Sequence, residues 1–308
     1  MESLHYHNPY SGQTLITFFW ELFIRIWNFL RGESYPLATD EVQILVLIGV
    51  AASSGLVGSF LVLRKMTMLA NSLSHTILLG IVAAFLLTRG GLDYAETGML
   101  NIQALLGASI ATGFLTAFLT EFLTKSARLQ EDASTGLVFT TLFALGIILV
   151  TLLTRSAHVG TEAVMGNADA LHIDDLKLVY FVLAANVVLC ILFFKEYKIT
   201  TFDPGLARTF GIAVVFFNYL LMAQVSATVI GAFRAVGVLM VLAFITGPPL
   251  TARLLTHDLK KMLLLSVLIG GFASLFGVAL ARHFLTVWGI ALSTGGVVVC
   301  VISLIYVS

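Results

Sequence analysis

The chain has 308 residues, of which 58% are hydrophobic and 11% are charged. Soluble domains have roughly 45–50% apolar and about 25% charged residues, so this composition excludes an ordinary soluble domain and predicts an integral membrane protein. The 17 basic and 17 acidic residues balance, and the net charge therefore gives no indication of a nucleic-acid partner.

Residues 1–40 are expected to form a separate extracytoplasmic segment. Within it, the stretch from Gln13 to Arg31 carries Glu21 and Arg25 four residues apart, and aromatic residues fill its other faces. A charged pair at this spacing on an otherwise apolar helix favours an amphipathic helix that lies on the membrane surface.

Residues 41–308 are expected to form a transmembrane domain. A helix needs about 20 apolar residues to cross the hydrocarbon core. Nine windows near this length contain no Asp, Glu, Lys or Arg: 42–63, 66–88, 97–120, 133–154, 178–194, 209–233, 235–252, 262–281 and 283–308. Alternating ten-residue segments typical of membrane strands are absent. The predicted fold class is therefore all-α, a polytopic membrane helix bundle of eight to nine transmembrane helices.

The charges between these windows predict how the chain is oriented. The loops after the first, third, fifth and seventh windows hold ten Lys and Arg residues, whereas the alternating loops hold five. Because short cytoplasmic loops collect Lys and Arg, the first set is expected to face the cytoplasm. The chain is then expected to start outside.

One junction between windows is open to several interpretations. The windows 209–233 and 235–252 are separated by Arg234 alone, so this region could be a tight hairpin, a broken helix or one long kinked helix. A single crossing would place the next basic loop outside, which favours two crossings or a re-entrant pair. Gly231 and Gly237 would permit a sharp bend of the backbone.

Asn71 and His75 lie in an almost uncharged window, in the stretch "LANSLSHTILLG", and share a helical face with Ser74. Polar groups inside a membrane are functional candidates, and imidazole is a common ligand of transition metals. This face would then line a pore or contact a partner helix. Alternatively, these groups form interhelical hydrogen bonds, each worth about 0.6–2 kcal/mol.

Glu131 and Asp132 stand side by side where the fourth window begins, in "LQEDASTGLVF". Two carboxylates at this point could offer oxygen ligands to a cation. The alternatives are a solvated interfacial loop, or acids that favour the positive end of a helix beginning near Ala133. From this segment alone, the alternatives are favoured.

Asp203 and Pro204 lie in "KEYKITTFDPGLARTFGI", the longest loop on the predicted cytoplasmic side. Asp at the N-cap and Pro at the first helical position predict a short helix, and Gly211 would end it. A short helix between two spans suits docking to a cytoplasmic partner. An ordinary structured loop is the alternative.

The sequence contains no catalytic motif. It has no Walker-type phosphate loop, no paired-cysteine metal motif, no HExxH and no GxSxG. The chain is therefore not expected to be an enzyme, and the energy for any pumping is expected to come from another subunit.

Taken in order, these segments resemble the membrane permease subunit of bacterial ABC transporters that import zinc, manganese or iron. The resemblance covers roughly Gln43 to Val307. Besides "GSFLVLRKMTMLANSLSHTILLGI", "EDASTGLVFTTLFALGIIL" and "FDPGLARTFGI", the fragments "VMGNADALHIDDL" and "AVGVLMVLAFITGPPLTARLL" are similar to segments of that family. Five fragments in the family's order make the resemblance specific. It implies the fold of an ABC metal-importer permease in the bacterial cytoplasmic (inner) membrane.

The resemblance also implies partners. The chain is expected to work in a permease dimer with two cytoplasmic ATPase subunits and an extracytoplasmic metal-binding protein. The helix that carries Asp203, Ala207 and Gly211 would couple to the ATPase, and the loop 155–177 would face the binding protein. No tightly bound cofactor is expected, since the divalent metal would be the transported substrate.

For the metal path, the resemblance points to His75 and Asp132, and more weakly to Glu131. The family usually has Asp where this chain has Asn71, and an amide oxygen is a poorer, uncharged ligand for a divalent ion. This departure suggests that a second, different permease supplies the missing carboxylate.

Two functions of other classes compete with this interpretation. A secondary transporter driven by an ion gradient would also have polar residues in mid-span, often with inverted repeats, but no convincing repeat relates the two halves of the sequence. An intramembrane metalloprotease would need a fuller set of ligands, such as HExxH.

Overall fold

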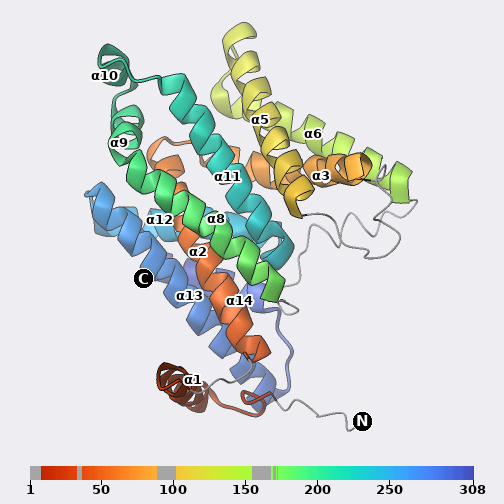
Figure 1. The fold of residues 1–308 in the computed structure, drawn as a ribbon, viewed down its shortest axis with the longest axis vertical. Coiled ribbons are helices and arrows are strands. Elements are labelled where there is room, and N and C mark those ends of the chain that lie inside the picture. The colour runs from red at the N-terminus through yellow and green to blue at the C-terminus, as the bar shows by residue number, and fades with distance from the viewer. Residues whose placement is uncertain (1–7, 33–36, 89–101, 155–167, 169–170, 172) are drawn as a thin grey trace.

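The computed structural model describes residues 8–32, 37–88, 102–154, 168, 171 and 173–308. Within these residues the chain forms twelve helices and no strand (Figure 1): α1 (Leu15–Leu30), α2 (Thr39–Leu63), α3 (Thr67–Thr88), α5 (Ile102–Ser126), α6 (Glu131–Thr154), α8 (Ile173–Leu192), α9 (Phe194–Phe202), α10 (Pro204–Thr209), α11 (Val214–Val236), α12 (Val238–Leu255), α13 (Leu259–Trp288) and α14 (Thr294–Val307). The all-α helix bundle predicted from the sequence is confirmed.

Each of the nine apolar windows overlaps one of these helices. Within the described residues, four segments are long and apolar enough to cross a membrane: Thr39–Leu63, Asp175–Leu192, Val214–Phe233 and Leu259–Trp288. Shorter apolar segments lie in α5, α6, α12 and α14. The windows thus locate the helices well, because long uncharged runs have few other ways to satisfy their backbone in a membrane.

The predicted boundary between the last two windows is wrong. These windows meet at Arg282, but α13 continues through Arg282 to Trp288. The charge does not end the helix, because the Arg282 guanidinium forms an ion pair with Asp40. Gly289, in the left-handed conformation at φ 65°, ends it instead. The 14 residues of α14 then span about 21 Å, less than the hydrocarbon core of about 30 Å.

The region 209–252 forms two helices rather than one long kinked helix. Gly237 alone separates α11 from α12, and its φ of 78° lies where other residues are strained. Of the two glycines that could permit a bend here, Gly237 is the one at the break.

α2 is the central helix of the bundle, buried along most of its length and in contact with α8, α11, α12 and α13. Small residues allow this close packing, as is usual between membrane helices. A Cβ atom built on Gly58 would overlap the carbonyl oxygen of Ile245 on α12, and one built on Gly55 would lie 2.8 Å from Ser266 Oγ on α13. These two glycines therefore set the distance between α2 and its neighbours.

Replacing Gly58 with alanine is expected to loosen the contact between α2 and α12. The new Cβ would push two backbones apart, and overpacking of this kind costs about 1–3 kcal/mol. The midpoint of thermal unfolding of the purified chain in detergent should fall. Gly271→Ala is the matched control, because no atom lies within 4 Å of a Cβ at that position of α13. Equal midpoints for the two variants would contradict the close packing at Gly58.

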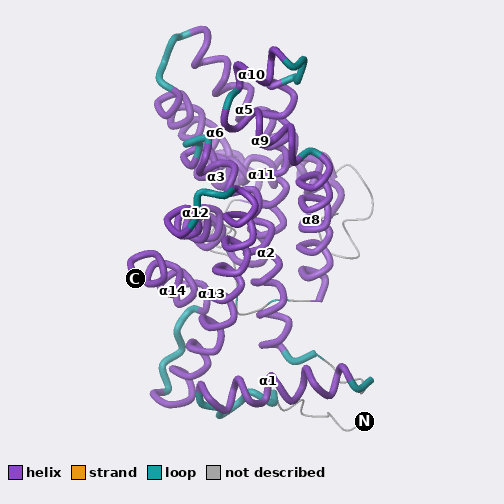
Figure 2. The backbone as a smooth tube through the Cα atoms, turned by 90° about the vertical axis from the view of Figure 1, so that its left-hand side faces the viewer, coloured by secondary structure: helices purple, strands orange, loops and turns teal. Residues whose placement is uncertain are grey.

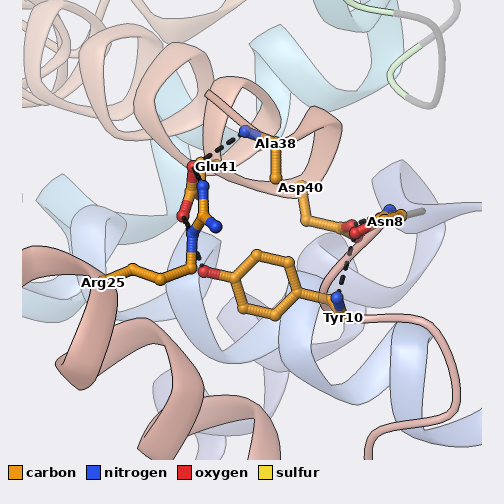
Figure 3. A network of polar contacts seen from close by, with 6 residues as sticks. All are labelled: Asn8, Tyr10, Arg25, Ala38, Asp40 and Glu41. Carbon is orange, nitrogen blue, oxygen red and sulfur yellow. Dashed lines mark hydrogen bonds and ion pairs between the residues drawn. The ribbon is translucent and has the colours of Figure 1, made fainter. Parts of the chain in front are cut away.

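The segment before α2 is fastened to the bundle by Glu41 (Figure 3). Glu41 accepts hydrogen bonds from the Tyr10 hydroxyl and the Ala38 backbone N–H, each at 2.8 Å, and forms an ion pair with Arg25 of α1. Burial, and next the contact with Glu41, raise the pKa of Tyr10, so the phenol stays protonated and donates. Asp40 makes a second connection, because it accepts a hydrogen bond from the Asn8 side chain and forms an ion pair with Arg282 of α13.

α1 lies crosswise beneath the ends of α2 and α13 (Figure 2). Its Phe18 is fully buried, whereas Ile16, Trp20, Phe23 and Trp27 form an exposed row on the opposite face. A crosswise orientation is the one that a helix lying in the plane of the membrane interface would have. The surface location predicted for this helix stays a prediction.

Contacts between helix ends distinguish the two ends of the bundle. At one end, Arg64 after α2 bonds to α9, and Lys260 at the start of α13 lies over the ring of Phe194. At the other end, the backbone N–H of Leu15 in α1 donates to Nδ1 of His283 in α13. Several loops with the most positive charge therefore share the end that carries α9 and α10 (Figure 1), which is the predicted cytoplasmic end.

Candidate functional site

His75 lies on α3 and faces α6. The centre of its ring is 5.0 Å from that of Phe139 and 5.3 Å from that of Phe143, two residues one turn apart on α6. The side chain is half-buried, and Nδ1 is buried without a hydrogen-bond partner among the described residues. Because each imidazole nitrogen can donate or accept, the hydrogen-bonding capacity of Nδ1 is left unused by the described residues.

Buried hydroxyl groups gather on the same three helices, α3, α5 and α6. Thr116 of α5 donates to Thr76 of α3 at 3.1 Å. One turn away from this bond lie Ser72 on α3 and Thr120 on α5, and their hydroxyls are buried without a partner in the described part of the chain, as is that of Ser134 on α6. Unpaired polar groups are costly in an apolar bundle, so the hydroxyls of Ser72 and Thr120, one turn from the bond between α3 and α5, favour a polar ligand there.

The other predicted metal-path residues are placed only in part. Asn71 lies one turn before His75 on α3 and is half-buried. Asp132 lies in the first turn of α6, seven residues or about 10 Å before Phe139. Seven residues are close to two turns, so the backbone places Asp132 on the face of α6 that contacts His75. The side chains of Glu131 and Asp132 lie outside the described residues.

The structure thus brings α3 and α6 together at His75 but does not display a complete ligand set. Among the residues that the structure describes, no three His, Cys, Asp or Glu side chains are close enough to hold one metal ion. The loop 155–177, predicted to face a binding protein, falls largely outside the described ranges.

A second polar cluster joins α2, α8 and α11. Asn186 Nδ2 donates to Ser53 Oγ at 2.7 Å and to Thr228 Oγ1 at 2.6 Å, and all three side chains are buried. One turn before Thr228 on α11, Gln224 accepts a hydrogen bond from the buried hydroxyl of Tyr197 on α9. Burial raises the pKa of Tyr197, which keeps the phenol protonated. These bonds hold α9 against the bundle.

Arg64, the residue after α2, makes a further connection to α9. Its Nε and Nη2 atoms donate to the hydroxyls of Thr201 at 3.1 Å and Thr200 at 3.0 Å, and Nη1 donates to Oδ1 of Asn218 on α11 at 2.5 Å. Burial lowers the pKa of Arg64 to about 10, so the guanidinium remains charged at neutral pH. The sequence indicated Arg64 only as a cytoplasmic loop cation, and no local signal pairs it with threonines more than 130 residues away.

The short helix predicted after Asp203 is present as α10. The Asp203 carboxylate accepts a hydrogen bond from the backbone N–H of Leu206 at 2.9 Å, and Pro204 is the first helical residue. After the helix, Gly211 has a φ of 75°, which fits its predicted role in ending it. The cap and the stop are local features, and this is why the sequence revealed them.

α10 stands at one end of the bundle, the end where α5 also meets α6 (Figure 1). Ala207 points inward and is fully buried, whereas three large apolar side chains around the helix are exposed: Phe202 (58%), Leu206 (46%) and Phe210 (68%). Three exposed apolar side chains on one small projection are typical of a surface that binds another protein.

Comparisons with known proteins agree on one family. The model of the ABC 3 transport family matches residues 40–308. The chain is 40% identical to a "Probable metal transport system membrane protein" of Chlamydia trachomatis serovar D, over 97% of this chain and 92% of the relative. It is also 40% identical to the manganese transport system membrane protein MntD of Bacillus subtilis, over 83% and 84%. Among solved structures, PsaBC from Streptococcus pneumoniae in complex with Fab is similar, with a TM-score of 0.71, 28% identity, and 86% and 88% of the two chains covered.

Proposed function

The chain belongs to the ABC 3 transport family, and from this premise we propose that it is the permease through which an importer moves a divalent transition metal: manganese, zinc or iron. It is a multi-pass protein of the bacterial inner membrane, and its family is one of transport permeases rather than enzymes. The match over residues 40–308 carries this proposal. The manganese transport name of the Bacillus subtilis relative supports manganese as the first ion to test.

We propose that the ion passes between two permeases along the face of α3 that holds His75. The buried unpaired Nδ1 of His75 supports this path, and so do the unpaired hydroxyls on α3 and α5. Asp132 and, less directly, Glu131 would add carboxylate oxygens from α6, and Asn71 would add an amide oxygen. Binding at this point should be modest in strength, because a passage that holds its ion too tightly cannot release it.

The driving force is proposed to reach the permease through α10. A cytoplasmic ATPase subunit would hold the exposed apolar side chains of this helix, with Asp203, Ala207 and Gly211 fixing its shape. The link from α9 to α2 and α11 through Arg64 and Tyr197 supports this route. An extracytoplasmic binding protein would deliver the ion, which is the transported substrate; no tightly bound cofactor and no nucleic-acid partner are proposed.

Uptake of manganese into vesicles tests the proposed function. The chain, reconstituted with its ATPase and binding protein, should accumulate manganese only when ATP is supplied on the ATPase side. An ionophore that collapses ion gradients should leave this uptake unchanged. The opposite pattern, uptake that needs a gradient but no ATPase, would show a secondary transporter instead.

Asn71 stands where the family usually has Asp, and this leads us to propose a dimer of two different permeases. An amide carries no charge, so a carboxylate from a second chain would complete the site. Complexes that contain this chain alone with the ATPase are then expected to hydrolyse ATP but to transport little metal, and an Asn71→Asp variant should transport more. If a complex with this chain as its only permease showed full ATP-driven uptake, the heterodimer proposal would be wrong.

A further inference from the structure

A groove of about 640 Å³ lies on the outer side of the bundle between α2, α8 and α13. Ala52 and Leu56 of α2 form its floor, and Leu183 and Val187 of α8 face Leu264 of α13 across it. Its volume falls within the roughly 300–1,000 Å³ of ligand sites. The groove is separate from the candidate metal path, since α13 and the group formed by α3, α5 and α6 lie on different sides of the bundle (Figure 1).

One end of this apolar groove carries a positive charge. Lys260, in the first turn of α13, is the only charged side chain among the described residues that line it. Its Nζ atom lies 5.8 Å from the centre of the Phe194 ring, which also lines the groove. The groove is therefore a long apolar surface with a single ammonium group at one end. That end lies on the side of the bundle that carries α9 and α10.

The groove is open on the surface of the chain, where in a membrane it would face lipid. Exposed apolar side chains flank it on both sides, with Val188 and Leu192 on α8 and with Leu268 and Phe272 on α13. In a membrane such rows face acyl chains, because no water is present to penalise their exposure. A ligand of this groove would thus enter from the bilayer, with its tail among apolar side chains and its polar group near Lys260.

We propose that the groove binds an anionic phospholipid of the cytoplasmic leaflet, with an acyl chain between α8 and α13 and the phosphate at Lys260. Basic residues beside grooves between helices on the cytoplasmic side recognise anionic head groups. Exposed lysines at the same end strengthen the positive field: Lys195 and Lys198. This inference concerns the chain's own lipid and does not depend on which metal is transported.

The role of the Lys260 charge can be tested by native mass spectrometry of the purified permease complex. The complex is titrated with phosphatidylglycerol or with phosphatidylcholine of the same acyl chains. The complex is expected to retain phosphatidylglycerol preferentially. Lys260→Ala should weaken phosphatidylglycerol binding about five-fold and leave phosphatidylcholine binding unchanged. Lys261→Ala, which removes an exposed neighbouring charge outside the groove, is the matched control. Equal retention of both lipids, or equal effects of the two lysine variants, would overturn the proposal.

A second pair of variants tests the groove itself. Val187→Trp should fill the groove and abolish preferential retention of phosphatidylglycerol, whereas Val188→Trp, on the exposed side of α8, should retain it as the unmodified chain does. If Val187→Trp instead separates the permease from a partner subunit, the groove is a protein interface and the lipid proposal fails. The lysine variants decide the question independently, because Lys260 is exposed and its truncation leaves the packing of α13 intact.

Discussion

Replacing His75 with alanine is expected to abolish ATP-driven metal uptake while the permease still assembles with its partners. The imidazole faces Phe139 and Phe143, and its Nδ1 atom has no hydrogen-bond partner in the described part of the chain. Its loss would remove the proposed ligand for the ion but no hydrogen bond that holds α3 to α6. The measurement is manganese uptake into vesicles, set beside the yield of the complex and its ATP hydrolysis.

Two further variants separate a ligand role from a packing role of His75. His75→Phe keeps an aromatic ring that can pack against Phe139 and Phe143 but offers no ligand atom, so uptake should remain far below that of the unmodified chain. His257→Ala makes the same truncation at an exposed histidine and should leave uptake unchanged. Normal uptake by His75→Ala would mean that the histidine only packs against the two phenyl rings, as an interhelical contact.

The sequence predicted the positions of the membrane helices because their signal is local. A run of about 20 apolar residues indicates a span whatever surrounds it, and α10 was predictable because Asp203 caps the helix that it precedes. The end of α13 was not predictable in this way. Arg282 looked like a boundary, but its charge is matched by Asp40, which lies 242 residues earlier in the chain.

In the candidate site, too, only the residues with a local sequence signal were predictable. His75 and Asn71 stood out because polar side chains are rare inside an apolar window. The hydroxyls of Ser72, Thr120 and Ser134 did not, because serine and threonine are common in membrane helices and usually bond to their own backbone. Only the packing of three helices shows that these hydroxyls are buried without partners.

Arg64 is the residue whose loss should most strongly separate ATP hydrolysis from transport. Its guanidinium joins the end of α2 to Thr200 and Thr201 on α9 and to Asn218 on α11. α9 leads directly into α10, so a displacement of α10 by the proposed ATPase partner would reach α2 by this connection. α2 contacts α8, α11, α12 and α13, and its displacement would therefore move most of the bundle.

Arg64→Ala is accordingly expected to leave ATP hydrolysis by the assembled transporter in place and to lower metal uptake about ten-fold. The substitution leaves three acceptors without their charged donor, which costs about 1–3 kcal/mol at the contact between α2 and α9. Since about 1.4 kcal/mol corresponds to a ten-fold change in rate, a loss of this size is enough. The measurement is the ratio of metal transported to ATP hydrolysed in the same vesicles.

The conservative variant and a neighbouring cation make this test specific. Arg64→Lys keeps the charge but cannot reach three acceptors with a planar fork, so its ratio should lie between those of Arg64→Ala and the unmodified chain. Lys65→Ala removes the adjacent, exposed charge and should leave the ratio unchanged. If uptake and hydrolysis fell together in Arg64→Ala, Arg64 would serve docking of the ATPase; a graded loss of the ratio alone would mean that α2 receives the motion of α10 through this side chain.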